Sequence, residues 1–313
     1  MTNKFYIVVP SFNEEDNIEN FIKDVDQLNL NNFSYNIIFV DDGSTDETWK
    51  KIEYFNSINE KVIGIKLTRN FGKDSAIEAG LNFVNKDSNC KFAIIIDADL
   101  QHPIKKIPEM IIEWEKNFKI VTTYKKNNVE NILRKIGSDL FYFLMTKFSD
   151  AKFITKNTDF MLIDKKIIEI FSNFLEKNKS IKTFINWTGY KNKSLEIEIE
   201  KRKEGKSKFN FLYLTRIAVN AITSFSFFPL KIVGYLGFIM SLFSIILIPV
   251  LIFFKWINFF YVSFQTIIII FNIFLTGITL SCLGLLGIYI SKIHQNSISR
   301  PSYIVEKNLS EKK

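Results

Sequence analysis

The chain has few of the residues on which several classes of protein depend. Only two cysteines, Cys90 and Cys282, occur among its 313 residues, so a disulfide-stapled fold is excluded and a reducing compartment fits. No group of cysteines and histidines has the spacing of a zinc site. The chain also has no G-x-G-x-x-G turn after its first predicted strand and no Walker A loop, which argues against a dinucleotide-binding fold and a P-loop NTPase. Because the N-terminus opens on a strand pattern, we predict no cleavable signal peptide.

Charge is missing from two long stretches near the C-terminus. Residues 232–254 and 256–291 contain no Asp, Glu, Lys or Arg. Since a helix rises about 1.5 Å per residue, each stretch can cross a hydrocarbon core about 30 Å thick. Basic residues on both outer flanks predict a hairpin, Ile232–Phe254 and about Thr266–Ile290, with both flanks in the cytosol. The preceding segment, Phe209–Phe228, mixes aromatic and polar residues and predicts a helix lying in the membrane interface.

The remaining chain is basic, with a net charge of +8 and a pI of about 9.2. That balance favours anionic partners such as lipid headgroups and nucleotide or lipid phosphates. The basic residues gather beside the apolar segments and not among aromatic residues of the predicted sheet. We therefore expect no nucleic-acid partner.

The first 125 residues alternate between strand and helix patterns. Four strands are predicted, at Phe5–Pro10, Asn36–Val40, Val62–Lys66 and a run that ends at Ile96. The predicted helices reach to about Leu28, span Glu47–Phe55, pass through Ala76 and Leu81, and span Ile107–Trp114. This alternation predicts an α/β domain with a parallel sheet and right-handed crossovers. Further along, we expect short strands at Ile120–Thr123 and Leu195–Ile199 and an amphipathic helix at about Val129–Phe148.

Acidic and polar turns follow three of these strands. Asp97 and Asp99 come directly after the apolar fourth strand, Asp41–Asp46 follows the second, and Ser11–Glu15 follows the first. Because the carboxyl ends of parallel strands meet at one edge, these turns are expected to converge there. Two carboxylates one residue apart offer hard oxygen ligands to a divalent cation, which Mg²⁺ complements with phosphate oxygens and water.

Four motifs stand in the order and spacing of a known family. They are Val9–Glu14 (VPSFNE), Asp41–Asp46 (DDGSTD), Arg69–Lys73 (RNFGK) and Asp97–Pro103 (DADLQHP). From about Lys4 to Val305 the chain resembles family 2 glycosyltransferases of the dolichol-phosphate mannose synthase and bactoprenol glucosyltransferase type.

Two later segments extend this resemblance. Arg202–Lys208 is similar to the family's Arg-x-x-Gly-x-Ser-Lys motif. Asn157–Asp164 resembles a Gly-Asp-Phe-Arg-Leu-Met-Asp segment of the bacterial subgroup, with Thr158 and Met161 in place of the usual glycine and arginine. A different cation would then have to take over the role of that arginine.

The resemblance implies a mostly parallel-sheet GT-A (Rossmann-like) catalytic domain followed by a C-terminal transmembrane helical hairpin. We accordingly expect a cytosolic domain at 1–208, an interfacial region at 209–230, two transmembrane helices at 231–291 and a cytosolic tail at 292–313. The implied enzyme is a metal-dependent, inverting hexosyltransferase serving a cell-envelope polysaccharide. It would move a sugar from a nucleotide-diphosphate sugar, expected to be a UDP-sugar, to a polyprenyl phosphate such as undecaprenyl phosphate. A multi-pass homo-oligomer in the inner (cytoplasmic) membrane is expected, with the catalytic domain facing the cytosol.

The resemblance also implies roles for single residues. Mg²⁺ or Mn²⁺ is expected on Asp97, Asp99 and Gln101. The nucleotide is expected on Pro10, Phe12, Glu14, Asp42, Ala98 and Lys125. The acceptor phosphate is expected on Arg134, Arg202, Ser207 and Lys208, with Lys125 as a further candidate. Asp159 is expected to orient the acceptor or to act as a base, and it joins Asp97, Asp99 and Arg202 as a catalytic candidate. His102 is expected to be structural, and Asp41 can equally cap its own turn.

The chemistry of a phosphate acceptor explains why cations matter more than a base. A phosphate monoester has a second pKa near 6, so at neutral pH it is already largely dianionic and a ready nucleophile. What it needs is positive charge that holds it against an anionic donor. No second carboxylate is marked as a covalent nucleophile, so we expect a one-step displacement with inversion at C1.

Three rival interpretations bear on the same residues. A processive polysaccharide synthase would carry a Gln-x-x-Arg-Trp motif, and none of the four tryptophans stands in one. A membrane-tethered glycosyltransferase with a hydroxyl acceptor remains open. So does an inactive membrane scaffold, although the intact Asp97/Asp99 pair argues against it.

Overall fold

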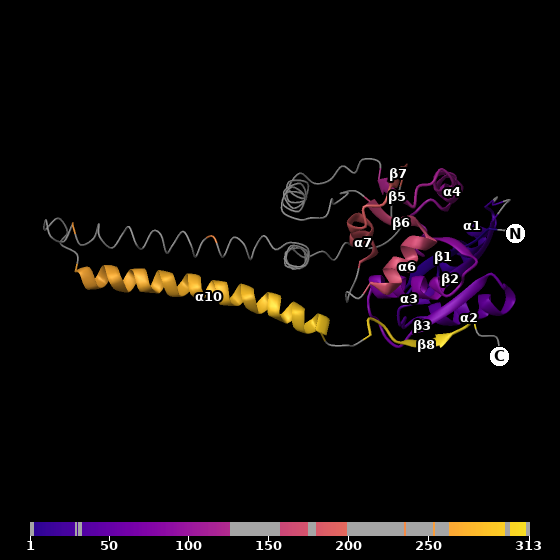
Figure 1. The fold of residues 1–313 in the computed structure, drawn as a ribbon. Helices are drawn as coiled ribbons and strands as arrows, with labels where there is room; N and C mark the ends of the chain where they lie inside the picture. Colours follow the sequence, from indigo (N-terminus) through magenta and orange to yellow (C-terminus); the bar gives the residue numbers. More distant parts are fainter. Residues whose placement is uncertain are drawn as a thin grey trace. The chain divides into compact units, whose positions relative to one another are not determined.

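The computed structural model describes residues 3–28, 30, 33–125, 157–174, 180–198, 235, 253, 263–297 and 301–310. The chain divides into two compact units (Figure 1). The sheet unit comprises Met1–Gly137, Lys152–Ser207 and Arg300–Lys313, and the helical unit comprises Ser138–Ala151 and Lys208–Ser299.

The sheet unit contains an eight-stranded mixed sheet among the described residues. Its strands are β1 (Asn3–Ser11), β2 (Phe33–Asp41), β3 (Val62–Leu67), β4 (Cys90–Ile95), β5 (Ile120–Lys125), β6 (Asn157–Asp164), β7 (Asn192–Ile197) and β8 (Val305–Asn308). Its helices are α1 (Ile18–Asp26), α2 (Thr48–Ile58), α3 (Lys73–Asn85), the short 3₁₀ turn η1 (Ile104–Lys106), α4 (Ile107–Glu115), α6 (Lys165–Asn173) and α7 (Ile181–Trp187).

The strand order is β7-β5-β6-β4-β1-β2-β3-β8. Strands β4, β1, β2 and β3 are parallel, as the alternating pattern predicts. β6 is antiparallel to both of its neighbours, β4 and β5, and β8 is antiparallel to β3. The order reverses between β1 and β4, which is the switch point at which open α/β sheets bind ligands.

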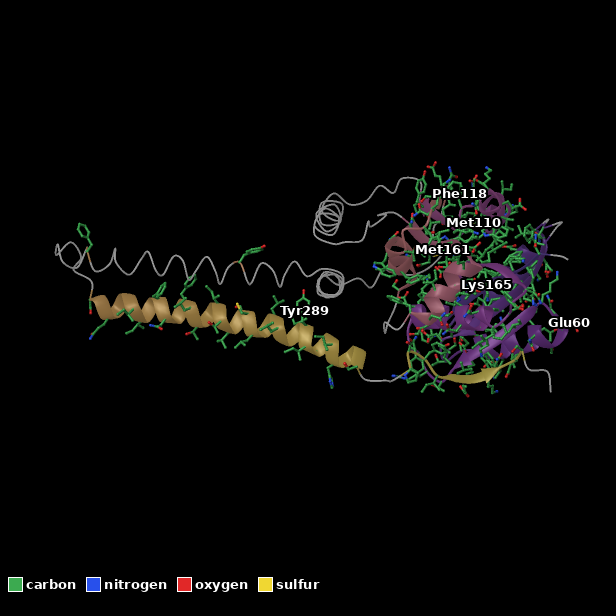
Figure 2. The ribbon with its side chains drawn as sticks, viewed as in Figure 1. Glu60, Met110, Phe118, Met161, Lys165 and Tyr289 are labelled. Carbon is green, nitrogen blue, oxygen red and sulfur yellow. The ribbon has the colours of Figure 1, made fainter. Side chains whose placement is uncertain are left out.

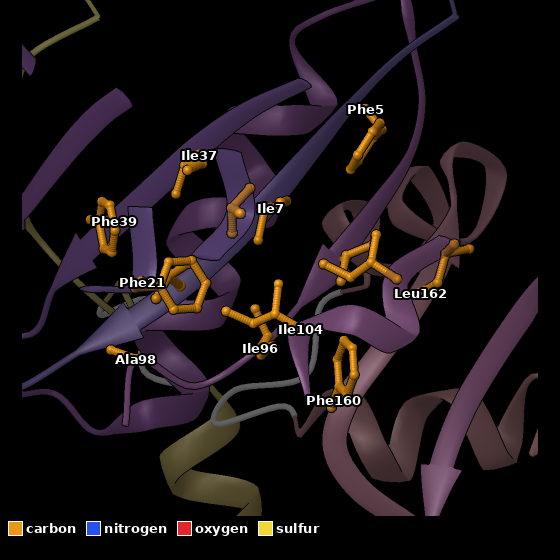
Figure 3. Packing of buried hydrophobic residues seen from close by; sticks show 14 of the residues in the cluster. Phe5, Ile7, Phe21, Ile37, Phe39, Ile96, Ala98, Ile104, Phe160 and Leu162 are labelled. Carbon is orange, nitrogen blue, oxygen red and sulfur yellow. The ribbon is translucent and has the colours of Figure 1, made fainter. Parts of the chain in front are cut away.

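Two apolar layers cover the two faces of the sheet, because successive side chains of a strand point to opposite sides. Along β1, Phe5, Ile7 and Val9 pack with α1, α2 and α4 on one face. Figure 3 shows Phe5 and Ile7 of this layer together with Phe21 of α1. Tyr6 and Val8 pack with α3, α6 and α7 on the other. The central strands are therefore buried on both faces and consist of nearly continuous apolar runs, as buried parallel strands do.

Helix α6 is fastened to the end of α3 by a long-range contact. Lys165, the first residue of α6, is labelled in Figure 2. Its Nζ atom donates to the backbone carbonyl of Asn85 at 2.6 Å and to that of Val84 at 3.2 Å. These carbonyls belong to the last turn of α3, where no N–H group within the helix is available to bond to them. The contact holds β6, which leads directly into α6, beside the central strands.

The C-terminal segment adds a strand that the sequence analysis did not anticipate within the predicted tail. Residues 301–310 run along the edge of β3, where Thr68 donates to the carbonyl of Ile304 at 3.0 Å and Leu309 donates to that of Gly64 at 2.8 Å. Asn82 also donates to the hydroxyl of Tyr303 at 2.9 Å. The segment covers a sheet edge that would otherwise expose unpaired backbone groups.

In the helical unit, the structure describes one long helix, α10 (Phe264–Ser297). Its stretch Phe274–Ser291 is long and apolar enough to cross a membrane, and none of that stretch is buried. Apolar side chains such as Leu280, Leu283 and Ile290 are exposed around it. This helix contains the second predicted span. The first predicted span lies outside the described residues apart from Tyr235 and Phe253, so the hairpin stays a prediction, as do the interfacial helix and the helix at Val129–Phe148.

Candidate active site

The turns after β1 and β2 are joined by hydrogen bonds. Asn13 has a positive φ of 56°, and its backbone N–H donates to Oγ of Ser44 at 2.9 Å. In return, the backbone N–H of Thr45 donates to Oδ1 of Asn13 at 2.9 Å. The N–H of Glu14 donates to Oγ1 of Thr48, at the start of α2, at 2.8 Å. The two motifs therefore form one rigid surface at the carboxyl edge of the sheet.

Asp42 joins the β2 turn to the turn after β3. Its two carboxylate oxygens accept from the backbone N–H groups of Phe71 at 2.7 Å and Gly72 at 2.9 Å. Burial raises the pKa of Asp42 above its usual value, and the two backbone hydrogen bonds partly offset that effect. Asp42 is 4% exposed, and the structure shows it organising this turn, while its nucleotide-binding role stays a prediction.

The neighbouring residues of the β2 turn are fitted closely to it. Gly43 has φ of +70° and lies against the backbone of Arg69 and Asn70, where a Cβ would meet Cα of Arg69 and N of Asn70 at 2.7 Å. Asp41 is fully buried, and its Oδ1 accepts from the N–H of Ser44 at 3.0 Å. Asp41 therefore caps its own turn, which is the structural role allowed for it above.

The register of β4 and β6 places Asp97 opposite Asp159. Ile95, the last residue of β4, pairs with Met161, and extending this antiparallel register by two residues brings Asp97 to Asp159. Lys73, the first residue of α3, bridges the two carboxylates. Its Nζ lies 2.6 Å from Oδ1 of Asp97 and 2.6 Å from Oδ2 of Asp159. The turn after β3 thus meets the turn after β4.

A second lysine completes this cluster of charges. Nζ of Lys182, on α7, lies 2.7 Å from Oδ1 of Asp159. Burial opposes ionisation of Asp159, but Lys73 and Lys182 outweigh it, and the pKa of Asp159 is lowered. The pKa of Asp97 is lowered as well, since the His102 imidazole and the Lys73 ammonium together outweigh burial. Both carboxylates are therefore anionic at neutral pH.

The Asp97–Pro103 turn has a distinctive local geometry. Leu100 adopts a positive φ of 57°, and the N–H of Gln101 donates to Oδ1 of Asp99 at 3.2 Å. The buried His102 places Nε2 3.6 Å from Oδ2 of Asp97, packs near Phe160 and leaves Nδ1 without a partner among the described residues. This position suits support of the Asp97 carboxylate, in line with the structural role expected for His102.

The residues on this turn fit a divalent cation. Asp97 and Asp99 are partly exposed carboxylates on one short turn, and Gln101 adds an amide oxygen beside them. Asp97 already binds a cationic group, so the site stabilises positive charge. Within the described part of the chain no cluster of three or more His, Cys, Asp and Glu residues could hold a metal alone. A pair of carboxylates matches Mg²⁺ or Mn²⁺, which obtains its other ligands from phosphate and water.

The predicted nucleotide residues lie at the same edge but differ in accessibility. Phe12 is 42% exposed and Glu14 is partly exposed, whereas Pro10 is buried. Ala98 is 2% exposed, and its side chain belongs to the apolar core (Figure 3), so that only its backbone can face a ligand. Lys125 is exposed at the end of β5, which runs in the same direction as β4 because both are antiparallel to β6.

The expected acceptor-phosphate residues Arg134, Arg202, Ser207 and Lys208 lie outside the described residues, and their roles stay predictions. Two residues that the site brings together, Lys73 and Lys182, were not among the predicted site residues. Lys73 closes the RNFGK motif, and its place after a strand-edge turn was a usable signal. Lys182 has no local signal, because only the packing of α7 against α3 and α6 brings it to Asp159.

The amino-acid sequence of this chain is similar to those of known glycosyltransferases. A family model described as glycosyl transferase family 2 matches residues 6–185. An uncharacterized glycosyltransferase of Synechocystis sp. is 32% identical over 97% of this chain and 95% of that protein. The SfII prophage-derived bactoprenol glucosyl transferase of Shigella flexneri is 32% identical over 97% of this chain and 98% of that protein. A solved structure of glucosyl-3-phosphoglycerate synthase from Mycobacterium tuberculosis has a TM-score of 0.49 at 13% identity, covering 71% of this chain and 78% of that one.

Proposed function

The chain belongs to glycosyl transferase family 2, with a mostly parallel, Rossmann-like GT-A sheet, and from that membership we propose that it transfers a sugar from a nucleotide-diphosphate sugar to a polyprenyl phosphate. The donor is a UDP-sugar, the transfer inverts C1, and the acceptor is presented at the cytosolic face of the membrane. Relatives named bactoprenol glucosyl transferase, similar over nearly the whole chain, support a lipid-phosphate acceptor.

One observation carries the proposal. The turns after β1, β2, β3 and β4 are tied into a single surface by contacts of Asn13, Asp42 and Lys73, and that surface ends at Asp97. Residues separated by more than eighty positions thus surround one sheet edge at its switch point. An inactive scaffold would have no need for a surface so densely cross-linked by polar groups.

The donor half of the site is built for a diphosphate. Asp97, Asp99 and Gln101 would hold a divalent cation, which supplies neutralisation of the charge that develops on the leaving nucleotide phosphate. His102 lies beside the Asp97 carboxylate, with Nε2 3.6 Å from Oδ2. The exposed ring of Phe12 and the carboxylate of Glu14 border the edge at which the base and ribose would lie.

The acceptor half follows from the direction of β7. β7 runs parallel to β5, with Ile197 opposite Lys125, so the chain leaves β7 at the edge that carries Asp97. β7 is three strands from β4, about 14 Å across the sheet at the usual strand spacing. Arg202 is five positions beyond Ile197, and five extended residues span at most about 17 Å. The chain between Ile197 and Arg202 is therefore long enough for Arg202, Ser207 and Lys208 to come to the site. There the charges of Arg202 and Lys208 and the hydroxyl of Ser207 would hold the acceptor phosphate.

The Lys73 and Lys182 contacts refine the role of Asp159. A carboxylate held by two ammonium groups, with a lowered pKa, is a poor base. A dianionic phosphate needs none. Asp159 is better suited to orient the two lysines at the edge where donor and acceptor meet. In this way Lys73 or Lys182 could take over the role of the arginine that Met161 replaces.

The lipid nature of the acceptor fits the helical unit. α10 carries an apolar stretch of 18 residues with none of it buried. A segment of that length is suited to a bilayer. After β7 the chain enters the helical unit at Lys208 and returns to the sheet unit at Arg300, shortly before β8. The proposed membrane segment is therefore followed in the chain by a strand of the sheet.

The proposal is tested with the full chain purified in detergent. It is incubated with Mg²⁺ or Mn²⁺, undecaprenyl phosphate and a panel of labelled nucleotide sugars, and lipid-linked sugar is separated by extraction. Asp97→Asn and Asp99→Asn should each reduce transfer by at least about 100-fold, since each removes a charge that acts on the developing transition-state charge. Asp26→Asn, a change at an exposed carboxylate that contacts Tyr35, is the matched control and should transfer normally.

Each other outcome has a definite meaning. Unchanged transfer by both site variants would remove the metal assignment. Transfer only to hydroxyl acceptors would support the tethered hydroxyl-acceptor enzyme, and no transfer from any donor would support the scaffold.

A further inference from the structure

Lys73 contacts the carboxylate that the proposed cation would bind. Oδ1 of Asp97 lies 2.6 Å from the Lys73 ammonium, and Oδ2 faces Nε2 of the buried His102 at 3.6 Å, so a cation on Asp97 would meet a positive group already in place. We propose that Lys73 and the divalent cation compete for Asp97, and that Asp159 holds the Lys73 ammonium whenever the cation occupies Asp97. The inference rests on the proposed function, which puts a cation on this turn. It makes Lys73 a positioning residue that acts through Asp97.

Electrostatics makes the two contacts exclusive. An ammonium and a divalent ion on one carboxylate oxygen would be separated by only a few ångströms, and Coulomb repulsion at that distance is strong in a partly desolvated site. Asp97 is 22% exposed and His102 beside it is buried, whereas the Lys73 side chain is 41% exposed, so water screens the repulsion only in part. One of the two cations must therefore leave Oδ1.

Lys73 has a partner to which it can withdraw. Its ammonium already lies 2.6 Å from Oδ2 of Asp159, so leaving Asp97 costs one ion pair and leaves the other in place. Lys182 occupies Oδ1 of the same carboxylate and keeps Asp159 anionic and oriented.

The backbone beneath Lys73 does not need to move. Lys73 is the first residue of α3, and Asp42 accepts from the N–H of Gly72 directly before it. A change in the side-chain torsions of Lys73 is therefore enough for the exchange. It also leaves the ammonium beside the cation, where an incoming diphosphate can use both charges.

Lys182 supplies a matched control. Both lysines contact Asp159, so Lys73→Met and Lys182→Met each remove one positive charge from the same cluster. Of these two lysines, only Lys73 contacts Asp97 as well. A general loss of charge would raise cation affinity similarly in both variants, whereas competition predicts a larger gain for Lys73→Met. Lys73→Arg keeps a cationic group on Asp97 and should therefore lack the gain in affinity expected for Lys73→Met.

The test measures Mn²⁺ binding by the full chain in detergent, without substrates, from the loss of the free Mn²⁺ electron paramagnetic resonance signal. Lys73→Met should bind Mn²⁺ about fivefold more tightly than Lys182→Met, a factor that corresponds to about 1 kcal/mol. Equal affinity in the two variants, or weaker binding by Lys73→Met, would overturn the inference while the cation site itself stands. Asp97→Asn should abolish binding in every background. If Mn²⁺ still binds to Asp97→Asn, or does not bind to the unchanged protein, the metal assignment in the proposed function fails as well.

Thermal unfolding of each variant, followed by circular dichroism, checks that the affinities come from folded protein. Lys73→Arg keeps the test decisive if Lys73→Met unfolds. In that case Lys73→Arg and Lys182→Arg are compared. The bulkier guanidinium at position 73, still paired with Asp97, should weaken Mn²⁺ binding relative to Lys182→Arg, and the reverse order would overturn the inference.

Discussion

Adding a methyl group at Gly43 should push the turn after β2 away from the turn after β3. The φ of +70° at Gly43 is unfavourable for any residue with a Cβ. In Gly43→Ala the added atom would also lie 2.7 Å from both Cα of Arg69 and N of Asn70, which are backbone atoms and cannot rotate away. The β2 turn must therefore move away from the turn after β3, and Asp42 must lose its hold on Phe71 and Gly72.

A second glycine isolates the steric part of this cost. Gly189 has φ of +67°, and a Cβ there would meet nothing within 4 Å. Gly189→Ala should therefore cost only the left-handed conformation, about 1–2 kcal/mol, less about 0.4–1 kcal/mol from reduced freedom of the unfolded chain. Gly43→Ala should cost about 1–3 kcal/mol more, the usual range for forcing an atom into a packed site. For a unit of this size, each kcal/mol lowers Tm by roughly 2–4 °C.

Thermal unfolding of the two full-length variants in the same detergent gives the comparison, with transfer activity as a second measurement. Gly189→Ala should keep its activity, whereas Gly43→Ala should lose donor binding because Asp42 is one of the residues predicted to bind the nucleotide. If Gly43→Ala is no less stable than Gly189→Ala, the two turns are not in the close contact on which the site depends.

Two further predictions concern the frame around the site. Burial opposes ionisation of Asp87, yet hydrogen bonds from Tyr6 and Lys4 lower its pKa to about 2. Because this pKa is below the unfolded value of about 3.9, the contribution of ionised Asp87 to folding stability is complete above about pH 4 and is lost as the pH falls through 2. Asp87→Asn should therefore lower the free energy of unfolding by about 1–2 kcal/mol near pH 6 and by progressively less below pH 4, measured by denaturant unfolding. A loss of stability that does not depend on pH would contradict this. Deleting residues 301–313 removes β8 and its backbone hydrogen bonds to Gly64 and Thr68, and should lower unfolding stability by about 2–3 kcal/mol. Deleting only residues 311–313 is the matched control and should leave Tm unchanged; equal Tm values for the two deletions would show that β8 does not stabilise the sheet.

Several parts of this protein could be predicted from local sequence. Some signals depend only on residues close together in the chain. They are the β-branched run before Asp97, the prolines and glycines that end strands, and the regular alternation of strand and helix. They were sufficient for the four parallel strands and for the convergence of the turns after β1, β2 and β4. The apolar length of α10 was equally visible, because a stretch without charge can be recognised without knowing its neighbours.

Contacts between distant segments were decided by tertiary structure alone. β6 follows β5 in sequence but inserts between β5 and β4, and β8 returns from beyond α10 to pair with β3. The ladders that place them form between residues far apart in the chain, so no local pattern specifies the partner or its direction. The same holds for Lys73, whose two carboxylate partners are 24 and 86 positions away. The sequence determined which side chains reach the sheet edge, because strand periodicity and turn chemistry are local properties. Which of those charges meet was set by strand register, since only the folded sheet brings Asp97 opposite Asp159 and places one ammonium between them.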